Sequence, residues 1–112
     1  MSPQDLAITG AVFTNTGAES IARAIERLPG LRDVNVSGNR IGDAGFLAIA
    51  KSSVAHIRHL NVSACGISCR GADEGLSILY ASDNTITLLA RENHGEDSFK
   101  KAEVGTCVAV SV

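Results

Sequence analysis

The chain lacks the features of a nucleic-acid binder and of a membrane-spanning protein. Its 112 residues carry 10 Lys and Arg against 12 Asp and Glu, a formal net charge of −2. Phosphate recognition needs a clustered excess of basic residues, and no basic run occurs here, so we expect no nucleic-acid partner. The apolar runs are far shorter than the roughly 18 consecutive residues of a spanning helix, so no membrane span is predicted.

Cysteine is scarce as well. Cys65, Cys69 and Cys107 are odd in number and lie in or beside apolar patterns, which favours reduced thiols over a disulfide scaffold. The opening segment, MSPQDLAITG, has no basic start followed by an apolar block, so we expect no secretory signal. Both observations predict an intracellular location, in the cytoplasm or an organelle matrix.

Catalytic patterns are also missing from the sequence. No Ser, His and Asp arrangement surrounds a nucleophile turn, and the glycine-rich segment GNRIGDAG, residues 38–45, lacks the Lys of a phosphate-binding loop. We therefore predict no enzymatic activity and no cofactor.

The chain does contain an internal repeat. Residues 31–45, LRDVNVSGNRIGDAG, recur at 57–71 as IRHLNVSACGISCRG. Both fit a template with apolar residues at positions 1, 4, 6 and 11, Asn or Cys at 9, and Gly at 15. Further copies place Leu6 at position 4 and, in LSILYASDNTI, Leu76, Leu79, Ala81 and Asn84 at positions 1, 4, 6 and 9. Four repeats are predicted, near 3–30, 31–56, 57–75 and 76–92.

The template resembles the leucine-rich repeat, and the Gly at position 15 before a helical segment is similar to the ribonuclease-inhibitor-like subclass. The resemblance implies an α/β solenoid with a short parallel sheet on its concave side and helices or loops on its convex side. The residues support the same picture. Positions 4 and 6 alternate with polar positions, as in strands with one buried face, and apolar stripes in 17–30 and 44–54 predict helices packed behind them.

The end of the chain departs from the template. Only 19 residues separate Ile57 from Leu76, so we expect CRGADEG to be a tight loop or a single helical turn that thins the convex side. Residues 93–103 are charged and predict a loop or short helix without an evident core. The last segment, VGTCVAV, predicts the strand of a partial fifth repeat, with Cys107 and Ala109 at positions 4 and 6, or an edge strand that pairs elsewhere.

The solvent-facing strand positions form a grid on the concave side, where solenoid proteins usually bind partners. Ile78 and Tyr80 are expected to be its apolar anchor, because aromatic residues often dominate interface energy. Alternatively, these side chains are merely solvated residues that make cross-strand contacts. The predicted protein-binding residues are Arg32, Asp33, Asn35, Arg58, His59, Asn61, Ile78 and Tyr80.

A zinc site is not predicted. Cys65 and Cys69 are four residues apart, and His59, His94 and Cys107 could be added, but no second closely spaced pair exists. Cys65 also occupies position 9 of the repeat, which points inward.

The function predicted from the sequence is protein binding without catalysis, as a subunit or scaffold of a multi-protein assembly. One alternative is a soluble recognition adaptor, such as the substrate reader of a ubiquitin ligase. Another is a GTPase-activating protein, since Arg40 lies just beyond a predicted strand, where it could reach a nucleotide on a bound GTPase.

Overall fold

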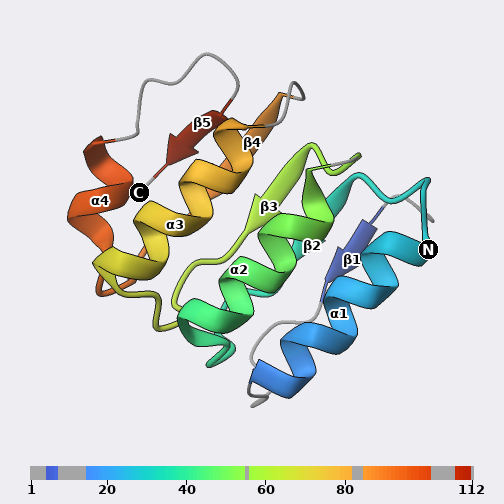
Figure 1. Ribbon diagram of the computed structural model, residues 1–112, viewed down its shortest axis with the longest axis horizontal. Helices are drawn as coiled ribbons and strands as arrows, with labels where there is room; N and C mark the ends of the chain where they lie inside the picture. The colour runs from blue at the N-terminus through green and yellow to red at the C-terminus, as the bar shows by residue number, and fades with distance from the viewer. Residues whose placement is uncertain (1–4, 8–14, 55, 82–84, 102–107, 112) are drawn as a thin grey trace.

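Strands and helices alternate along the chain and form two layers (Figure 1). The structure, a computed structural model, describes residues 5–7, 15–54, 56–81, 85–101 and 108–111. The helices lie together on one face of a single sheet. In chain order the elements are β1 (Asp5–Ala7), α1 (Asn15–Arg27), β2 (Asp33–Asn35), α2 (Gly42–Ser53), β3 (His59–Asn61), α3 (Cys69–Tyr80), β4 (Ile86–Leu89), α4 (Glu96–Lys101) and β5 (Val108–Ser111).

The sheet is parallel throughout, with the strands side by side in the order β1-β2-β3-β4-β5. Its register follows the repeat: Leu6 pairs with Val34, Val34 with Leu60, and Leu60 with Leu88. The predicted α/β leucine-rich-repeat architecture, with a parallel sheet backed by helices, is therefore confirmed.

The core lies between the sheet and the helices. The template positions 4, 6 and 11 are buried in the two central copies; Val36, Ile41, Val62 and Ile67 are all 0% exposed. Burying side chains of this size stabilises the fold by about 1.5–3 kcal/mol each relative to leaving them in water.

Neighbouring helices approach closely because glycines face the preceding helix. A Cβ atom added to Gly45 would lie 3.0 Å from the Cβ of Ala18 on α1 and 2.7 Å from the Cβ of Ile41. A Cβ on Gly75 of α3 would collide with the ring of Phe46 on α2. Gly45 and Gly71 hold position 15 of the template, and a Cβ on Gly71 would likewise collide with the Asp43 side chain of α2, so the glycine at this position permits helix stacking.

Position 9 satisfies backbone groups where the chain leaves each strand. The side chain of Asn39 donates to the carbonyl of Val36 at 2.8 Å, and Asn93 donates to the carbonyl of Val62 at 3.0 Å. In the copy between them, the Cys65 thiol donates to the carbonyl of Val36 at 3.3 Å. A thiol therefore replaces the amide here with a weaker donor.

The predicted loop at CRGADEG and the strand around Leu79 are both wrong. Residues 69–80 form the full helix α3, whose first turn is capped by the Ser68 side chain accepting a hydrogen bond from the Gly71 backbone N–H. Leu76 and Leu79, which fitted the strand template, instead lie with Ala72 on the buried face of the helix. The convex side is therefore not thinned at this repeat.

The fourth strand consequently begins later than predicted. β4 pairs with β3 so that Thr87 lies opposite His59, which places Leu88 at position 4 and Asn93 at position 9. Asn84, which the sequence pattern placed at position 9, lies outside the described residues.

The region after β4 contains more structure than its charge suggests. Residues 96–101 form α4, one of the two alternatives predicted, and the Phe99 side chain is completely buried. Its ring centroid lies 5.9 Å from that of Phe46 in an edge-on arrangement, so the expectation of no core here is wrong. β5 pairs with β4 in parallel, as expected for a partial fifth repeat, but its predicted register is wrong. Val110 lies opposite Leu88 and takes position 4, whereas Ala109 lies opposite Thr87 at position 3. Cys107 lies outside the described residues.

Candidate functional site

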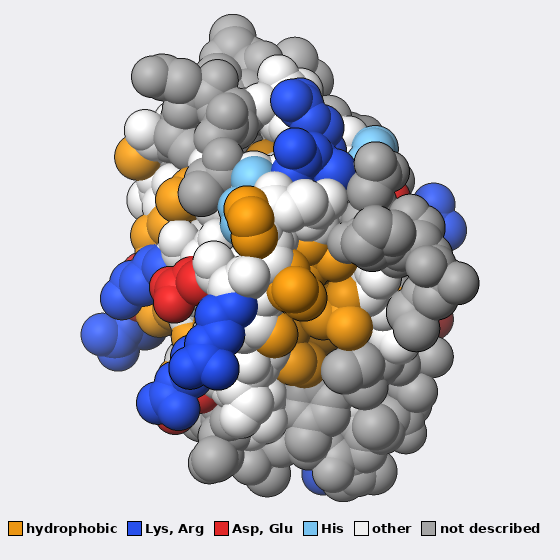
Figure 2. Space-filling model, turned by 90° about the vertical axis from the view of Figure 1, so that its right-hand side faces the viewer, with side chains coloured by type: hydrophobic (Ala, Val, Ile, Leu, Met, Phe, Trp, Pro, Cys, Tyr) orange, Lys and Arg blue, Asp and Glu red, His pale blue; other side chains and the backbone are white. Residues whose placement is uncertain are grey.

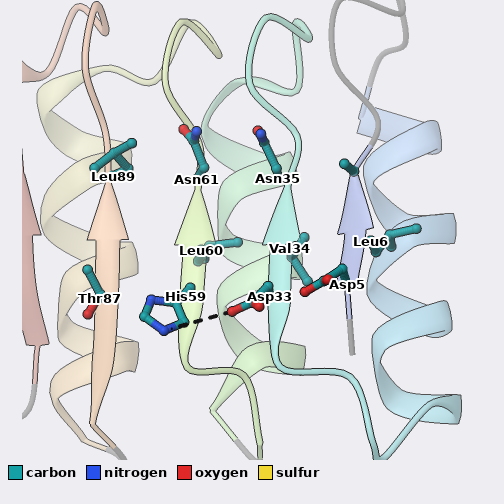
Figure 3. A pocket seen from close by; sticks show the side chains of 11 residues that line it. Asp5, Leu6, Asp33, Val34, Asn35, His59, Leu60, Asn61, Thr87 and Leu89 are labelled. Atoms are coloured by element: carbon teal, nitrogen blue, oxygen red, sulfur yellow. Dashed lines mark ion pairs between the residues drawn. The ribbon is translucent and has the colours of Figure 1, made fainter. Parts of the chain in front are cut away.

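The face of the sheet away from the helices carries a shallow hollow of about 300 Å³ (Figure 3). Because side chains alternate along a strand, every second residue of β1 to β4 points into it. Two rows cross the strands, one at the start of the strands and one at their end. We call this set the concave surface: Asp5, Asp33, His59 and Thr87 in the first row, and Ala7, Asn35, Asn61 and Leu89 in the second.

The first row begins with two neighbouring carboxyl groups, Asp5 and Asp33, which we call the carboxyl pair. A side-chain hydrogen bond to Asp33, together with loss of solvent and the negative charge of Asp33, raises the pKa of Asp5 above its ordinary 3.8. Nε2 of His59 lies 3.9 Å from Oδ1 of Asp33. Both side chains are substantially exposed, at 64% and 44%, and surface ion pairs contribute only about 0–1 kcal/mol.

Oδ1 of Asp33 is hidden from solvent but accepts no hydrogen bond from the described residues. A buried acceptor without a donor is unfavourable, by about 1–3 kcal/mol. The structure places one donor near this oxygen, Nε2 of His59 at 3.9 Å.

The second row is held rigid by two equivalent turns. Oδ1 of Asn35 accepts a hydrogen bond from the backbone N–H of Ser37 at 3.1 Å, and Oδ1 of Asn61 accepts one from that of Ser63 at 3.0 Å. The side-chain NH₂ groups of the two Asn residues have no partner among the described residues. They present two donors on adjacent strands beside the apolar side chain of Leu89 (Figure 3).

The structure brings together four of the predicted binding residues: Asp33, Asn35, His59 and Asn61 all line the hollow.

Arg32 and Arg58 do not line it. The Arg32 guanidinium donates to the carbonyl of Pro29 at 2.9 Å, of Leu31 at 3.2 Å and of His56 at 3.5 Å, so this side chain holds the loops before β2 and β3. Arg58 is exposed outside the hollow.

Ile78 and Tyr80 belong to α3 and not to a strand. Both are partly buried against the core on the helical side of the sheet, so the predicted apolar anchor of the concave surface is wrong. Thr87 and Leu89 of β4 occupy those positions instead. Asn93 is the sequence signal that could have located Thr87 and Leu89. It lies 28 residues after Cys65, about one repeat length, and its Oδ1 accepts a hydrogen bond from the backbone N–H of Cys65.

A second hollow, of about 550 Å³, lies at the ends of the strands. Arg40, the residue considered for a GTPase-activating role, lines it together with Glu92 and His94. Cys65 also reaches this hollow, but its thiol is 0% exposed, and burial raises its pKa to about 11. A neutral thiol of this kind is a structural group and a poor nucleophile.

Within the described ranges, no group of three or more His, Cys, Asp or Glu side chains could hold a metal ion. In the same part of the chain, no helix is both long and apolar enough to cross a membrane.

Comparison with known proteins agrees with the geometry. Residues 29–50, which comprise β2 and most of α2, match a family model described as "Leucine Rich repeat". The chain has a leucine-rich-repeat fold. The leucine-rich-repeat segment of this chain is also 27% identical over 97 residues to tubulin-specific chaperone E from Danio rerio. That match covers 81% of this chain but only 18% of the length of the chaperone.

Among solved structures, the leucine-rich-repeat fold seen here superimposes on "Leiomodin-1 Actin-Binding Site 2 (ABS2)" with a TM-score of 0.77. The superposition covers 97% of this chain and 70% of that structure, at 18% sequence identity. At this identity the likeness concerns the fold.

Proposed function

We propose that this leucine-rich-repeat segment is a protein-binding module without catalytic activity, and that its concave surface holds a segment of another protein. The observation that carries the proposal is the hollow across β1 to β4, in which the NH₂ groups of Asn35 and Asn61 and the carboxyl pair share one surface with the apolar side chain of Leu89. Interfaces combine these two elements: apolar contact supplies binding energy and polar groups supply register.

The polar groups define what the partner segment offers. The carboxyl pair favours a donor that is positively charged. The NH₂ groups of Asn35 and Asn61 require acceptors, which backbone carbonyls of the partner provide. Leu89 contacts an apolar side chain.

The names of the similar proteins support the same function. One is a tubulin-specific chaperone and the other an actin-binding site, so both names refer to another protein as the target. Actin and tubulin are accordingly the first purified proteins to test for binding.

Within this function we favour a subunit or scaffold of an assembly over a freely soluble adaptor. Figure 2 views the end of the molecule formed by α1 and β1, where apolar side chains gather on the surface. Leu28, directly after α1, is 48% exposed, and exposed apolar side chains of this size favour contact with a partner. Light scattering after size exclusion distinguishes the two forms: the adaptor gives a stable monomer alone, whereas the subunit is poorly soluble until it is co-expressed with its partner.

Site-specific photo-crosslinking tests the concave surface directly. A photoreactive amino acid replaces Thr87 in the hollow, and in the matched control it replaces Asp73, an exposed residue of α3 on the opposite side. In the native cell source we expect a discrete cross-linked protein with the probe at 87 and none with the probe at 73. The same result is expected when the partner identified in this way is purified and mixed with the chain.

Two further variants separate contact from folding. Leu89→Glu and Asp33→Lys should each weaken capture of the cross-linked partner by about tenfold or more, while Asp73→Lys leaves it unchanged. Cross-links from position 73 alone, or full binding by both concave variants, would contradict the proposal.

A further inference from the structure

The outer flank of α1 carries a third hollow, of about 450 Å³, lined by Ser20, Arg23, Ala24, Arg27 and Leu28. Leu28 is 48% exposed, the one exposed large apolar side chain among the described residues. It follows the last turn of the helix and lies beside two arginines, with the small residue Ala24 between them in the hollow.

The flank faces away from the rest of the solenoid. The opposite side of α1 packs on α2, where Ala18 faces Gly45 and Oε1 of Glu26 accepts a hydrogen bond from Ser52 at 3.2 Å. At about 3.6 residues per turn, Ala24 and Arg27 lie roughly half a turn away from that side.

Its composition resembles the surfaces that the other helices use for stacking. α2 and α3 pack on the preceding helix through small residues, Gly45 and Gly75, which let the two backbones approach. Ser20 and Ala24 give α1 a flank of small side chains, with Leu28 at one end. A surface of this shape accepts a helix, since small residues form the groove into which the ridge of a second helix fits.

The charges specify which helix fits. Arg23 and Arg27 are exposed, and the structure gives neither of them a carboxylate partner among the described residues. They are four residues apart and therefore lie on adjacent turns of one face. Of the acidic residues of α1, Glu26 is bonded to α2. Glu19 lies one turn before Arg23 on the same face, but it does not line the hollow and forms no ion pair with Arg23 among the described residues.

We propose that the outer flank of α1 is a second docking surface, and that it binds an acidic amphipathic helix of a partner protein. The apolar ridge of that helix covers Leu28 and Ala24, and its Asp or Glu side chains pair with Arg23 and Arg27. Arginine forms two parallel hydrogen bonds with a carboxylate, which gives the contact direction as well as attraction. This surface is independent of the concave surface, so either proposal can fail without the other.

A displayed library of helical peptides tests the chemistry of the flank directly. The peptides share one apolar ridge of Leu and Ala, and the positions flanking it vary among Asp, Glu, Lys and Arg. Sorting against the intact chain should enrich Asp and Glu on the flank that faces Arg23 and Arg27. Sorting against the double variant Arg23→Glu with Arg27→Glu should abolish that enrichment.

Affinity measurements on the selected peptide then test the apolar contribution of Leu28 against a charge reversal elsewhere on the surface. Leu28→Ser should weaken binding by about tenfold or more, whereas Arg70→Glu, a matched charge reversal on the exposed face of α3, should leave it unchanged. Enrichment of basic peptides, no enrichment at all, or acidic binding that survives the double variant would overturn the proposal. So would a dimer of the unmodified chain that Leu28→Ser dissociates, because the occupant would then be a second copy.

Discussion

Asn93 provides the sharpest test of the register of the fourth repeat. Its side chain is 6% exposed and makes four hydrogen bonds. Oδ1 accepts from the backbone N–H of Cys65 at 3.0 Å and of Ile67 at 3.1 Å, and Nδ2 donates to the carbonyls of Val62 at 3.0 Å and Arg91 at 3.3 Å. The substitution Asn93→Ala removes all four hydrogen bonds, and the alanine side chain offers no donor or acceptor to replace them.

The magnitude follows from the groups left behind. The N–H groups of Cys65 and Ile67 and the carbonyl of Val62 lose the side-chain partner in a buried turn. An unsatisfied buried group costs about 1–3 kcal/mol, and water entering from the adjacent hollow recovers part of that cost, so we expect a loss of about 3 kcal/mol or more. Because the free energy of unfolding of a domain is about 5–15 kcal/mol, this loss is a large fraction of the total.

Chemical denaturation gives the free energy of unfolding and thermal denaturation the melting temperature. A loss of about 3 kcal/mol corresponds to a fall of about 12 °C in a domain of this size. Arg91→Ala, an exposed neighbour, and Asn84→Ala, at the position that the sequence pattern favoured, serve as controls and should each change stability by less than about 1 kcal/mol. A small effect at Asn93 combined with a large one at Asn84 would refute the register.

Three further predictions concern packing, charge and thiol chemistry. Gly75→Ala should lower the free energy of unfolding by about 1–3 kcal/mol, measured in urea, because its methyl group would collide with the ring of Phe46. If the variant is as stable as the original chain, α2 and α3 do not pack as closely as described. Asp5→Asn should raise the melting temperature slightly at neutral pH and not in acid. The raised pKa of Asp5 means that its carboxyl group stabilises the fold below pH 3.8 and loses that contribution as the pH rises through the folded value, and melting curves between about pH 3 and about pH 7 check this. With a thiol reagent and peptide mapping by mass spectrometry, the exposed Cys69 should be modified in the folded chain, and Cys65, buried and with a pKa of about 11, only after unfolding. Equal rates at the two cysteines would contradict the inward position of Cys65.

The concave surface was partly predictable from the sequence. Alternation along a strand is a local property with a period of two residues, so DVN and HLN sufficed to place Asp33, Asn35, His59 and Asn61 on one face. The side chain of Arg32 could not be placed in this way. It is long enough to turn back from the strand, and the carbonyls that hold it come from two separate loops.

The segment LSILY illustrates where a repeat pattern alone fails. Its apolar residues fit both a strand template and the face of a helix, because a short apolar run satisfies either period. The helix forms because Ser68 caps it and because Gly75 allows it to stack against Phe46. The second of these contacts joins α3 to α2, and no window of local sequence contains both elements.

The sequence by itself determined the repeat, the parallel order of the strands and the inward face of the two central copies, since each depends on spacing that recurs along the chain. Only the tertiary structure decided that β4 supplies Thr87 and Leu89 to the concave surface, and that Phe99 completes the core against Phe46. It also placed Arg23, Arg27 and Leu28 around one hollow on the outer flank of α1. These features depend on which elements become neighbours, and that is settled by close packing between helices and by hydrogen bonds across repeats.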